Sequence, residues 1–274
     1  VLMPGLDVIP ALAAGAAMLL KPSEVTPLSA VEFVRGWTDI GAPPVLSLTT
    51  GYGETGAALV ENVDYVQFTG SAKTGKLIAK QCAERLIPYG LELGGKDAEI
   101  VLADADLDRA ANGIAWGGLF NAGQVCISVE RAYVEEPVYD EFLAKLTKNV
   151  DELRMGQDDR GYKFDVGAMA THARRDIMQR HVDEAVAGGA RVVTGGKAGS
   201  IGTFFEPTVL ADVDQSMSCI TEETFGPTLP IVKVADEAEV GEEGDDGIRL
   251  ARGRLAQQPA DGLADEELAV VRSE

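Results

Sequence analysis

Short apolar runs alternate with longer amphipathic stretches over the first ninety residues of the chain. The runs at 17–20, 45–49 and 65–68 carry no charge and have the length of buried strands. The stretches at 27–40, 54–60 and 71–86 have helical spacing, and the first of them should turn Leu28, Val31 and Val34 toward the core. This alternation predicts an α/β fold with a doubly wound parallel sheet.

The same alternation continues in the second half of the chain. Strands are expected at 99–102, 129–135, 191–194 and 204–206, the last of which leads into the segment 207–210, and helices at 106–120, 138–150 and 172–187. Either Asp104 or Asp106 is suited to cap the first of these helices.

The pattern ends after Val234. Residues 235–274 contain twelve Asp and Glu, four Arg and no aromatic residue, so they cannot bury a core. We expect this segment to be disordered or unrelated to the fold. Our hypothesis is a loss of reading frame near residues 238–248, which sequencing of the encoding DNA would test. Because the other end begins without Met, we expect the chain to start in the middle of a fold.

Composition excludes several classes of partner. A net charge of −20 disfavours binding to nucleic acid and to anionic membranes. Three widely spaced cysteines make neither a disulfide framework nor a zinc pattern, and no metal site is predicted. No targeting or membrane-spanning segment is visible, so a cytoplasmic protein is expected.

One cysteine stands where a nucleophile is expected. Cys126 follows an Asn-Ala-Gly turn and precedes an apolar run, and loop tips on a rigid scaffold are where reactive groups reach a substrate. Glu92 lies 34 positions earlier, just before Gly94-Gly95, and is a candidate general base. A cysteine considered alone is more often buried and inert, which is our interpretation of Cys82 and Cys219.

Two glycine-rich turns follow predicted strands, where ligands bind such sheets. The turn at 51–56 matches G-x-G-x-x-G but lacks the later acidic residue of the dinucleotide fingerprint, so a plain tight turn and a phosphate contact both stay open. The turn at 70–77 departs from a Walker A loop at Leu77, which argues against an ATPase. In that turn, Gly70, Ser71 and Gly75 open a helix whose free backbone N–H groups suit a pyrophosphate.

Two charged residues, Lys21 and Glu24, follow the first strand. They are either solvated charges or hydrogen-bond partners for ribose hydroxyls, and a glutamate there would favour NAD over NADP.

Five motifs occur in order along residues 1 to about 234. They are Lys21-Pro22-Ser23-Glu24, Phe68-Thr69-Gly70-Ser71 with Gly75, Glu92-Leu93-Gly94-Gly95-Lys96, Asn121-Ala122-Gly123-Gln124-Val125-Cys126 and Glu222-Glu223-Thr224-Phe225-Gly226-Pro227. Together they resemble the aldehyde dehydrogenase superfamily. The resemblance implies a partial dinucleotide-binding domain of doubly wound parallel type at 1–93, a partial α/β catalytic domain at 94–234 and an acidic tail at 235–274.

The resemblance also implies a function: NAD(P)-dependent oxidation of an aldehyde to a carboxylic acid through a cysteine thiohemiacetal and thioester. Cys126 would be the nucleophile and Glu92 the base. The implied cofactor contacts are Lys21 and Glu24 with the adenosine ribose, Ser71 with Gly70 and Gly75 at the pyrophosphate, Glu223 with the nicotinamide ribose and Phe225 at the nicotinamide.

The expected cofactor is NAD, with NADP as the alternative, and the expected partner is a small aldehyde, with succinate semialdehyde the first to test. Members of the family are homo-oligomers. Two other functions stay open: a catalytically inactive fragment, and a dehydrogenase that passes the acyl group to coenzyme A.

Overall fold

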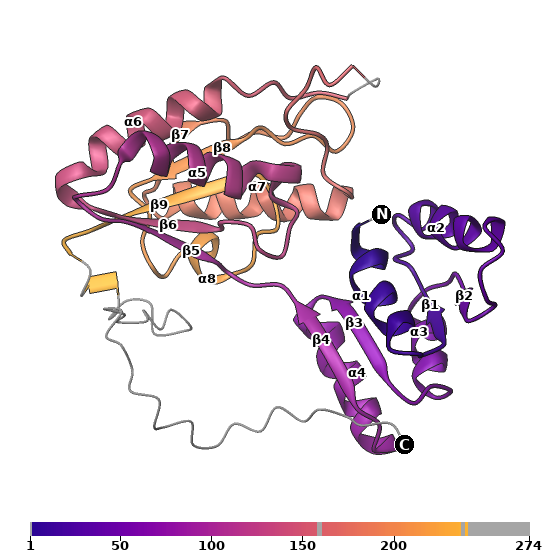
Figure 1. The fold of residues 1–274 in the computed structure, drawn as a ribbon. Coiled ribbons are helices and arrows are strands. Elements are labelled where there is room, and N and C mark those ends of the chain that lie inside the picture. The colour runs from indigo at the N-terminus through magenta and orange to yellow at the C-terminus, as the bar shows by residue number, and fades with distance from the viewer. Residues whose placement is uncertain (1, 158–160, 237–238, 241–274) are drawn as a thin grey trace, which may run out of the picture.

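The computed structural model describes residues 2–157, 161–236 and 239–240, and Figure 1 shows the chain as two bodies of helices and strands. We call residues 2–93 the first part and residues 94–240 the second part. Strands and helices alternate in both, so the predicted α/β class is confirmed. Most of the acidic segment at 235–274 lies outside the described residues.

The first part contains four helices and four short strands among its described residues. Its elements are α1 (Leu2–Ala13), β1 (Met18–Leu20), α2 (Leu28–Asp39), β2 (Leu46–Leu48), α3 (Gly53–Val60), β3 (Val66–Gly70), α4 (Ala72–Arg85) and β4 (Tyr89–Leu93). The pairing is parallel, as predicted. It divides the described strands into two separate pairs, β1 with β2 and β3 with β4.

The second part is built on a five-stranded sheet. Its elements are β5 (Ala98–Val101), α5 (Leu107–Leu119), a short 3₁₀ turn (Phe120–Gly123), β6 (Arg131–Glu135), α6 (Glu136–Asp151), α7 (His172–Ala187), β7 (Arg191–Thr194), β8 (Thr208–Ala211), α8 (Ser218–Thr221) and β9 (Thr228–Val234). The strand order is β5-β6-β9-β8-β7, and only the β7–β8 pair is antiparallel. The strand expected at 204–206 is wrong: Phe205 forms an isolated bridge with Ala198, and the strand β8 begins only at Thr208.

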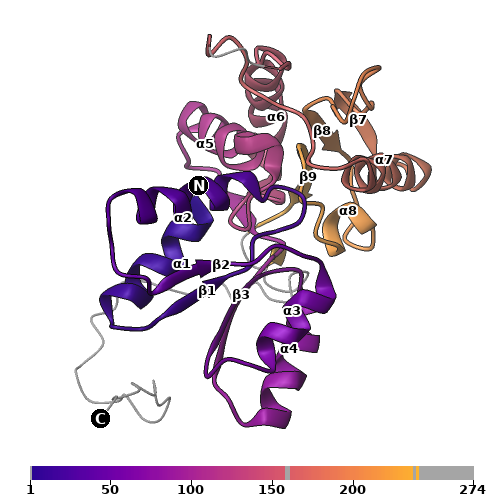
Figure 2. The ribbon, with the colours of Figure 1, turned by 90° about the vertical axis from the view of Figure 1, so that its right-hand side faces the viewer.

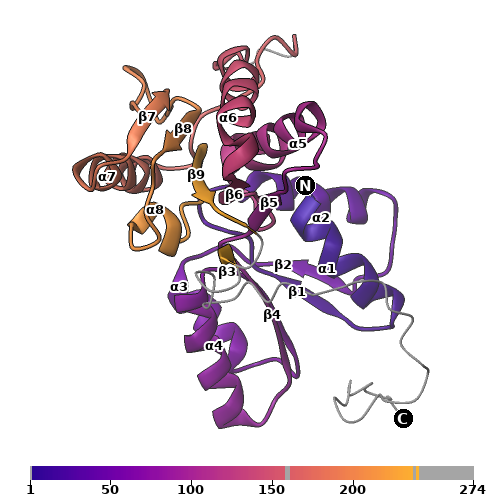
Figure 3. The same ribbon diagram turned by 90° about the vertical axis from the view of Figure 1, so that its left-hand side faces the viewer.

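Helices cover both faces of this sheet (Figures 2 and 3). Strand side chains alternate between the faces, so in β6 Ala132 and Val134 join the cluster beneath α5 and α6, whereas Tyr133 joins the cluster beneath α7 and α8. All four residues of β8 are buried, as expected for a strand covered on both sides. At the N-terminus of α5, Asp106 accepts hydrogen bonds from the amides of Asp108 and Arg109, which makes it the cap.

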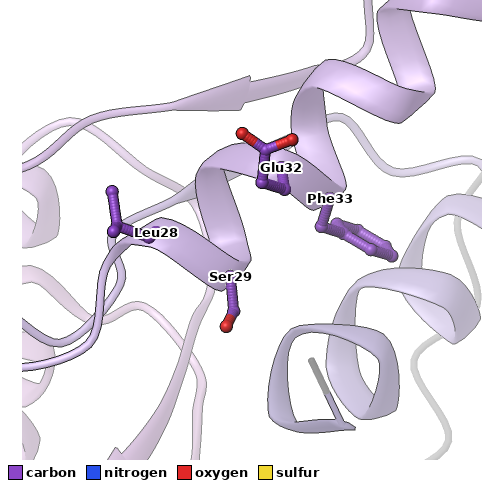
Figure 4. A pocket seen from close by; sticks show the side chains of 4 residues that line it. All are labelled: Leu28, Ser29, Glu32 and Phe33. Carbon is purple, nitrogen blue, oxygen red and sulfur yellow. The ribbon is translucent and has the colours of Figure 1, made fainter. Parts of the chain in front are cut away.

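Helix α2 departs from its prediction. Helical spacing placed Leu28 on the core side, but its side chain is 74% exposed, whereas Ala30 is buried. Val31 and Val34 are half-buried beside Ala30, so the predicted face is the packed one, and only Leu28, the first residue of α2, lies outside the contact. Leu28 instead lines a pocket with Ser29, Glu32 and Phe33 (Figure 4), which contains none of the predicted site residues. Among the described residues, no helix has both the length and the apolar character needed to cross a membrane.

Candidate active site

Cys126 lies at the tip of a tight turn between α5 and β6, and its side chain is exposed. The amide of Ser128 closes the turn by donating to the carbonyl of Val125 (3.0 Å). The buried Ser128 hydroxyl donates to the last turn of α5, at the carbonyls of Gly117 (3.2 Å) and Gly118 (3.3 Å). The thiol therefore lies on a loop that hydrogen bonds tie to the last turn of α5, and its role as a nucleophile stays a prediction.

The residues just before the turn adopt an unusual backbone. Asn121, Ala122 and Gly123 all have positive φ (52°, 56° and 67°), which residues with a Cβ seldom adopt. Local bonds hold this left-handed turn: the Asn121 amide group donates to the carbonyl of Gln124 (3.1 Å). The Gln124 side chain in turn accepts from the amide of Ala170 (2.7 Å). We call residues 121–130 the cysteine loop.

The cysteine loop packs directly on the loop at 222–227. A Cβ placed on Gly123 would lie 2.2 Å from the carbonyl oxygen of Gly226, so only glycine allows this approach. Next to that contact, Phe225 has a φ of 53°, and the Arg174 guanidinium lies 5.2 Å from the centre of its ring. The structure therefore brings the predicted nucleophile loop and the predicted nicotinamide-binding loop together.

Glu223 lies against the glycine pair that follows Glu92. A Cβ on Gly94 would meet the Glu223 carboxylate at 1.7 Å, and the amide of Gly95 donates a hydrogen bond to that carboxylate. Burial, and next the nearby Glu130 carboxylate, raise the pKa of Glu223, while Arg174 opposes this shift. The motif at 92–96 and the motif at 222–227 are thus in contact, although 128 positions separate Lys96 from Thr224.

Sequence reasoning missed Glu130, which is 5% exposed and pairs with Lys96 at 2.7 Å. Its carboxylate also accepts from the backbone amides of Thr224 and Phe225, each at 2.7 Å. One signal was available: Glu130 is a charged residue inside the apolar run before β6, and a buried charge requires a partner.

Glu92 lies in β4, with its side chain exposed. The side chain of Asp7 in α1 is near enough to respond to it: burial, followed by the charge of Glu92, raises the pKa of Asp7. In the described part of the chain, no hydrogen bond or ion pair joins the side chains of Glu92 and Cys126. The predicted role of Glu92 stays a prediction.

The predicted nucleotide-binding residues lie in the first part. The Lys21 ammonium donates to the carbonyls of Pro22 (2.9 Å) and Gly51 (3.0 Å), and it lies 3.8 Å from the Glu24 carboxylate. The Lys21 side chain therefore connects the segment after β1 with the glycine-rich turn at 51–56.

Ser71 caps α4, because its hydroxyl accepts from the amide of Thr74 (3.3 Å). Gly70 precedes it at the end of β3. Gly75 is buried against β4. A Cβ at this position would lie 2.8 Å from the Leu93 side chain, so the glycine allows α4 to pack closely on β4. Of this group, Ser71 and Gly70 are exposed and Gly75 is not.

The remaining cysteines and the buried histidine are held inside the protein. Cys82 and Cys219 are both fully buried, and burial raises the pKa of Cys219 to about 11. His181 is also fully buried, with Nδ1 3.2 Å from the Thr224 hydroxyl and Nε2 3.3 Å from the Glu222 carboxylate. Burial lowers the pKa of His181, which favours a neutral ring.

Comparison with known proteins identifies relatives over most of the chain. The sequence profile of the Aldehyde dehydrogenase family matches residues 1–246. A putative succinate-semialdehyde dehydrogenase [NADP(+)] 2 of Mycobacterium ulcerans is 41% identical over 246 residues, which cover 88% of this chain and 47% of the relative. A 4,4'-diapolycopene aldehyde oxidase of Methylomonas sp is 42% identical over 231 residues, which cover 84% of this chain and 43% of that relative.

Among solved structures, succinate-semialdehyde dehydrogenase from Burkholderia pseudomallei superimposes with a TM-score of 0.86 at 38% identity and covers 89% of this chain and 52% of that protein. The chain thus spans about half the length of the relatives that it matches.

Proposed function

The chain belongs to the aldehyde dehydrogenase family, and we propose that it carries the nucleophile, the base and the dinucleotide contacts for oxidation of an aldehyde to a carboxylic acid. The observation that supports this most strongly is the packing of the cysteine loop on the loop at 222–227, through Gly123 and Gly226. This contact brings the loop that carries the exposed Cys126 onto the loop that carries Glu223 and Phe225, which the family resemblance assigns to the nicotinamide end of the cofactor.

In the proposed reaction the Cys126 thiolate attacks the carbonyl carbon of the aldehyde, and the electron pair of the carbonyl bond moves to oxygen. The backbone N–H of Cys126 has no acceptor within the described residues and is available to bind that oxyanion. A bound oxidised nicotinamide supplies the hydride acceptor. Glu92 then takes a proton from the water that cleaves the resulting thioester, which releases the acid and restores the Cys126 thiol.

The residues of the first part fit a dinucleotide. The N-terminus of α4 is exposed and has no acidic residue in its first turn, so its amides and its dipole suit a pyrophosphate beside Ser71. Lys21 compensates part of the charge of Glu24, so Glu24 alone does not exclude a 2′-phosphate. Because a relative is named for NADP(+), both NAD+ and NADP+ are candidates.

We propose a small aldehyde as substrate and begin with succinate semialdehyde, because a relative at 41% identity is named for it. All three cysteines are free thiols, which suits a reducing cytoplasm, where we place the reaction.

The experiment follows the absorbance of NADH or NADPH formed by the purified chain with a panel of aldehydes. Turnover is expected in the wild type and should vanish in Cys126→Ala. Glu92→Gln should retain an initial burst of reduced cofactor and lose steady turnover by about 100-fold, because it removes only the activation of water. A folded wild-type chain without turnover for any aldehyde would refute the proposal for this chain.

Two control reactions separate the alternatives. Acyl-CoA that forms faster than free acid when coenzyme A is added would identify an acylating dehydrogenase. Turnover that persists in Cys126→Ala would show that the thiol is not the nucleophile.

A further inference from the structure

The loop at 222–227 places neighbouring side chains in different surroundings. Thr224 is 1% exposed, and its hydroxyl accepts from the Lys96 ammonium (2.9 Å). Glu223 and Phe225 on either side are half-buried, and they are the residues that the proposed function assigns to the cofactor. Each residue has only two soft backbone dihedrals. An interaction that fixes the backbone at Thr224 therefore also fixes the directions in which the side chains of Glu223 and Phe225 point.

Glu130 fixes that backbone with both oxygens of its carboxylate. Oε2 accepts from the amide of Thr224 (2.7 Å) and Oε1 from the amide of Phe225 (2.7 Å). Oε2 also accepts from the Lys96 ammonium at 2.7 Å. Hydrogen bonds to an ionised acceptor are short and strong, and two oxygens on consecutive amides define an orientation as well as a distance.

The energetics of this pair favour a role in geometry over a role in stability. Both side chains are almost fully buried, and burial lowers the pKa of Lys96 against the opposing effect of Glu130. Desolvation offsets most of the attraction in a buried ion pair, so such a pair adds little net stability. It does hold Phe225 at a φ of 53°, a conformation that residues with a Cβ seldom adopt unaided.

We propose that Glu130 is a positioning residue for the dinucleotide: with Lys96 as its counter-ion, it fixes the backbone of the 222–227 loop and thereby the places of Glu223 and Phe225. This role rests on the proposed function, since it acts on the cofactor through those two residues. Glu130 itself touches no reacting atom.

A glutamine cannot replace this carboxylate. It offers one carbonyl oxygen, so it can accept from one of the two amides while its NH₂ group faces the other donor. The variant E130Q should therefore release either Thr224 or Phe225 while keeping the size of the side chain. E135Q is the matched control: Glu135 is the last residue of β6, the strand that directly follows Glu130, and its carboxylate accepts a single amide hydrogen bond, from Ala103.

The test measures two quantities on the wild type, E130Q and E135Q. The first is the dissociation constant for NADP+ and for NAD+ by titration calorimetry. The second, which needs no cofactor, is the hydrogen-exchange rate of the Thr224 and Phe225 amides. In E130Q we expect faster exchange at one or both amides and dinucleotide binding weakened by about tenfold, since that corresponds to the loss of one hydrogen bond to a charged group. E135Q should match the wild type in both.

The outcomes distinguish this role from the proposed function. Dinucleotide binding that is unchanged in folded E130Q overturns the role of Glu130 and leaves the proposed function standing. A wild-type chain that binds neither dinucleotide refutes the proposed function and this role with it. E130Q leaves the buried Lys96 charge without its partner, which can prevent folding. In that case the double variant K96M/E130Q, which removes this charge, takes its place in both the binding and the hydrogen-exchange measurements.

Discussion

Gly123 makes the contact on which the candidate site depends, and alanine at this position tests it. A Cβ there would lie 2.2 Å from the carbonyl oxygen of Gly226 and 3.0 Å from that of Gly118. Ordinary carbon–oxygen contacts are about 3.3 Å or longer, so the two loops would have to separate by roughly 1 Å. Both obstructing atoms belong to the backbone, which cannot rotate aside as a side chain does.

The cost of Gly123→Ala has two components. Its φ of 67° costs a residue with a Cβ about 1–2 kcal/mol. Overpacking of a tight contact adds roughly 1–3 kcal/mol. We therefore expect the free energy of unfolding to fall by about 2–5 kcal/mol. In protein that remains folded, a displacement of this size between nucleophile and cofactor should slow turnover by about 100-fold.

Urea unfolding and steady-state turnover measure these two effects. Gly113→Ala is the control, because Gly113 lies within α5 and a Cβ there meets nothing within 4 Å. In a helix that change should stabilise the protein by about 0.5–1 kcal/mol and leave turnover unchanged. If Gly123→Ala has the stability and turnover of the wild type, the two loops are not held together as the structure indicates, and the reasoning is wrong.

Three further changes test other parts of the structure. Asp106→Ala removes the cap of α5 and should cost about 1 kcal/mol in urea unfolding; an unchanged midpoint would contradict the cap. Burial lowers the pKa of His181 below 6.5, so as pH falls through 6.5 the unfolded chain takes up a proton that the folded chain does not. Wild-type stability should therefore decline on acidification more steeply than that of His181→Gln, and parallel pH curves would contradict this. Ser71→Ala should lose about 1 kcal/mol with its cap and bind NADP+ more weakly, whereas Ser71→Asp should recover the stability but weaken binding further. Wild-type affinity in Ser71→Asp would exclude a phosphate at this helix.

Features with a local cause could be predicted from the sequence. The turn that presents Cys126 follows from an Asn-Ala-Gly segment before an apolar run. A cap at Asp104 or Asp106 follows from a short acidic side chain before a helical pattern, and the structure selects Asp106. The parallel strands follow from the alternation of strands and helices.

Features that depend on distant partners could not be predicted. The Glu130 partners lie 34 and 94 positions away, at Lys96 and Thr224, so the sequence could show only a charge in an apolar run. Ala122 adopts a positive φ that its residue type disfavours, and its side chain is buried in a core cluster of the second part whose other members are distant in sequence. Leu28 has the spacing of a core residue, but it is the first residue of α2 and stays exposed, whereas Val31 and Val34 on the same predicted face are half-buried.

The Lys96–Glu130 pair joins the segment that carries the proposed base to the loop that carries the proposed nucleophile. Lys96 follows Glu92 by four residues, and Glu130 follows Cys126 by four, so the Cα atoms within each of these two couples lie at most about 14 Å apart. The buried members of both core clusters begin at Val101, so Cys126 stands on the well-packed part of the chain, while Glu92 belongs to a strand paired only with β3 among the described residues. Between Glu92 and the fixed Lys96 lie Gly94 and Gly95, which leave that segment more conformational freedom than other residues would. Under the proposed function, the ion pair therefore ties the segment of the base to the loop of the nucleophile, and the two glycines leave the base room to change its position.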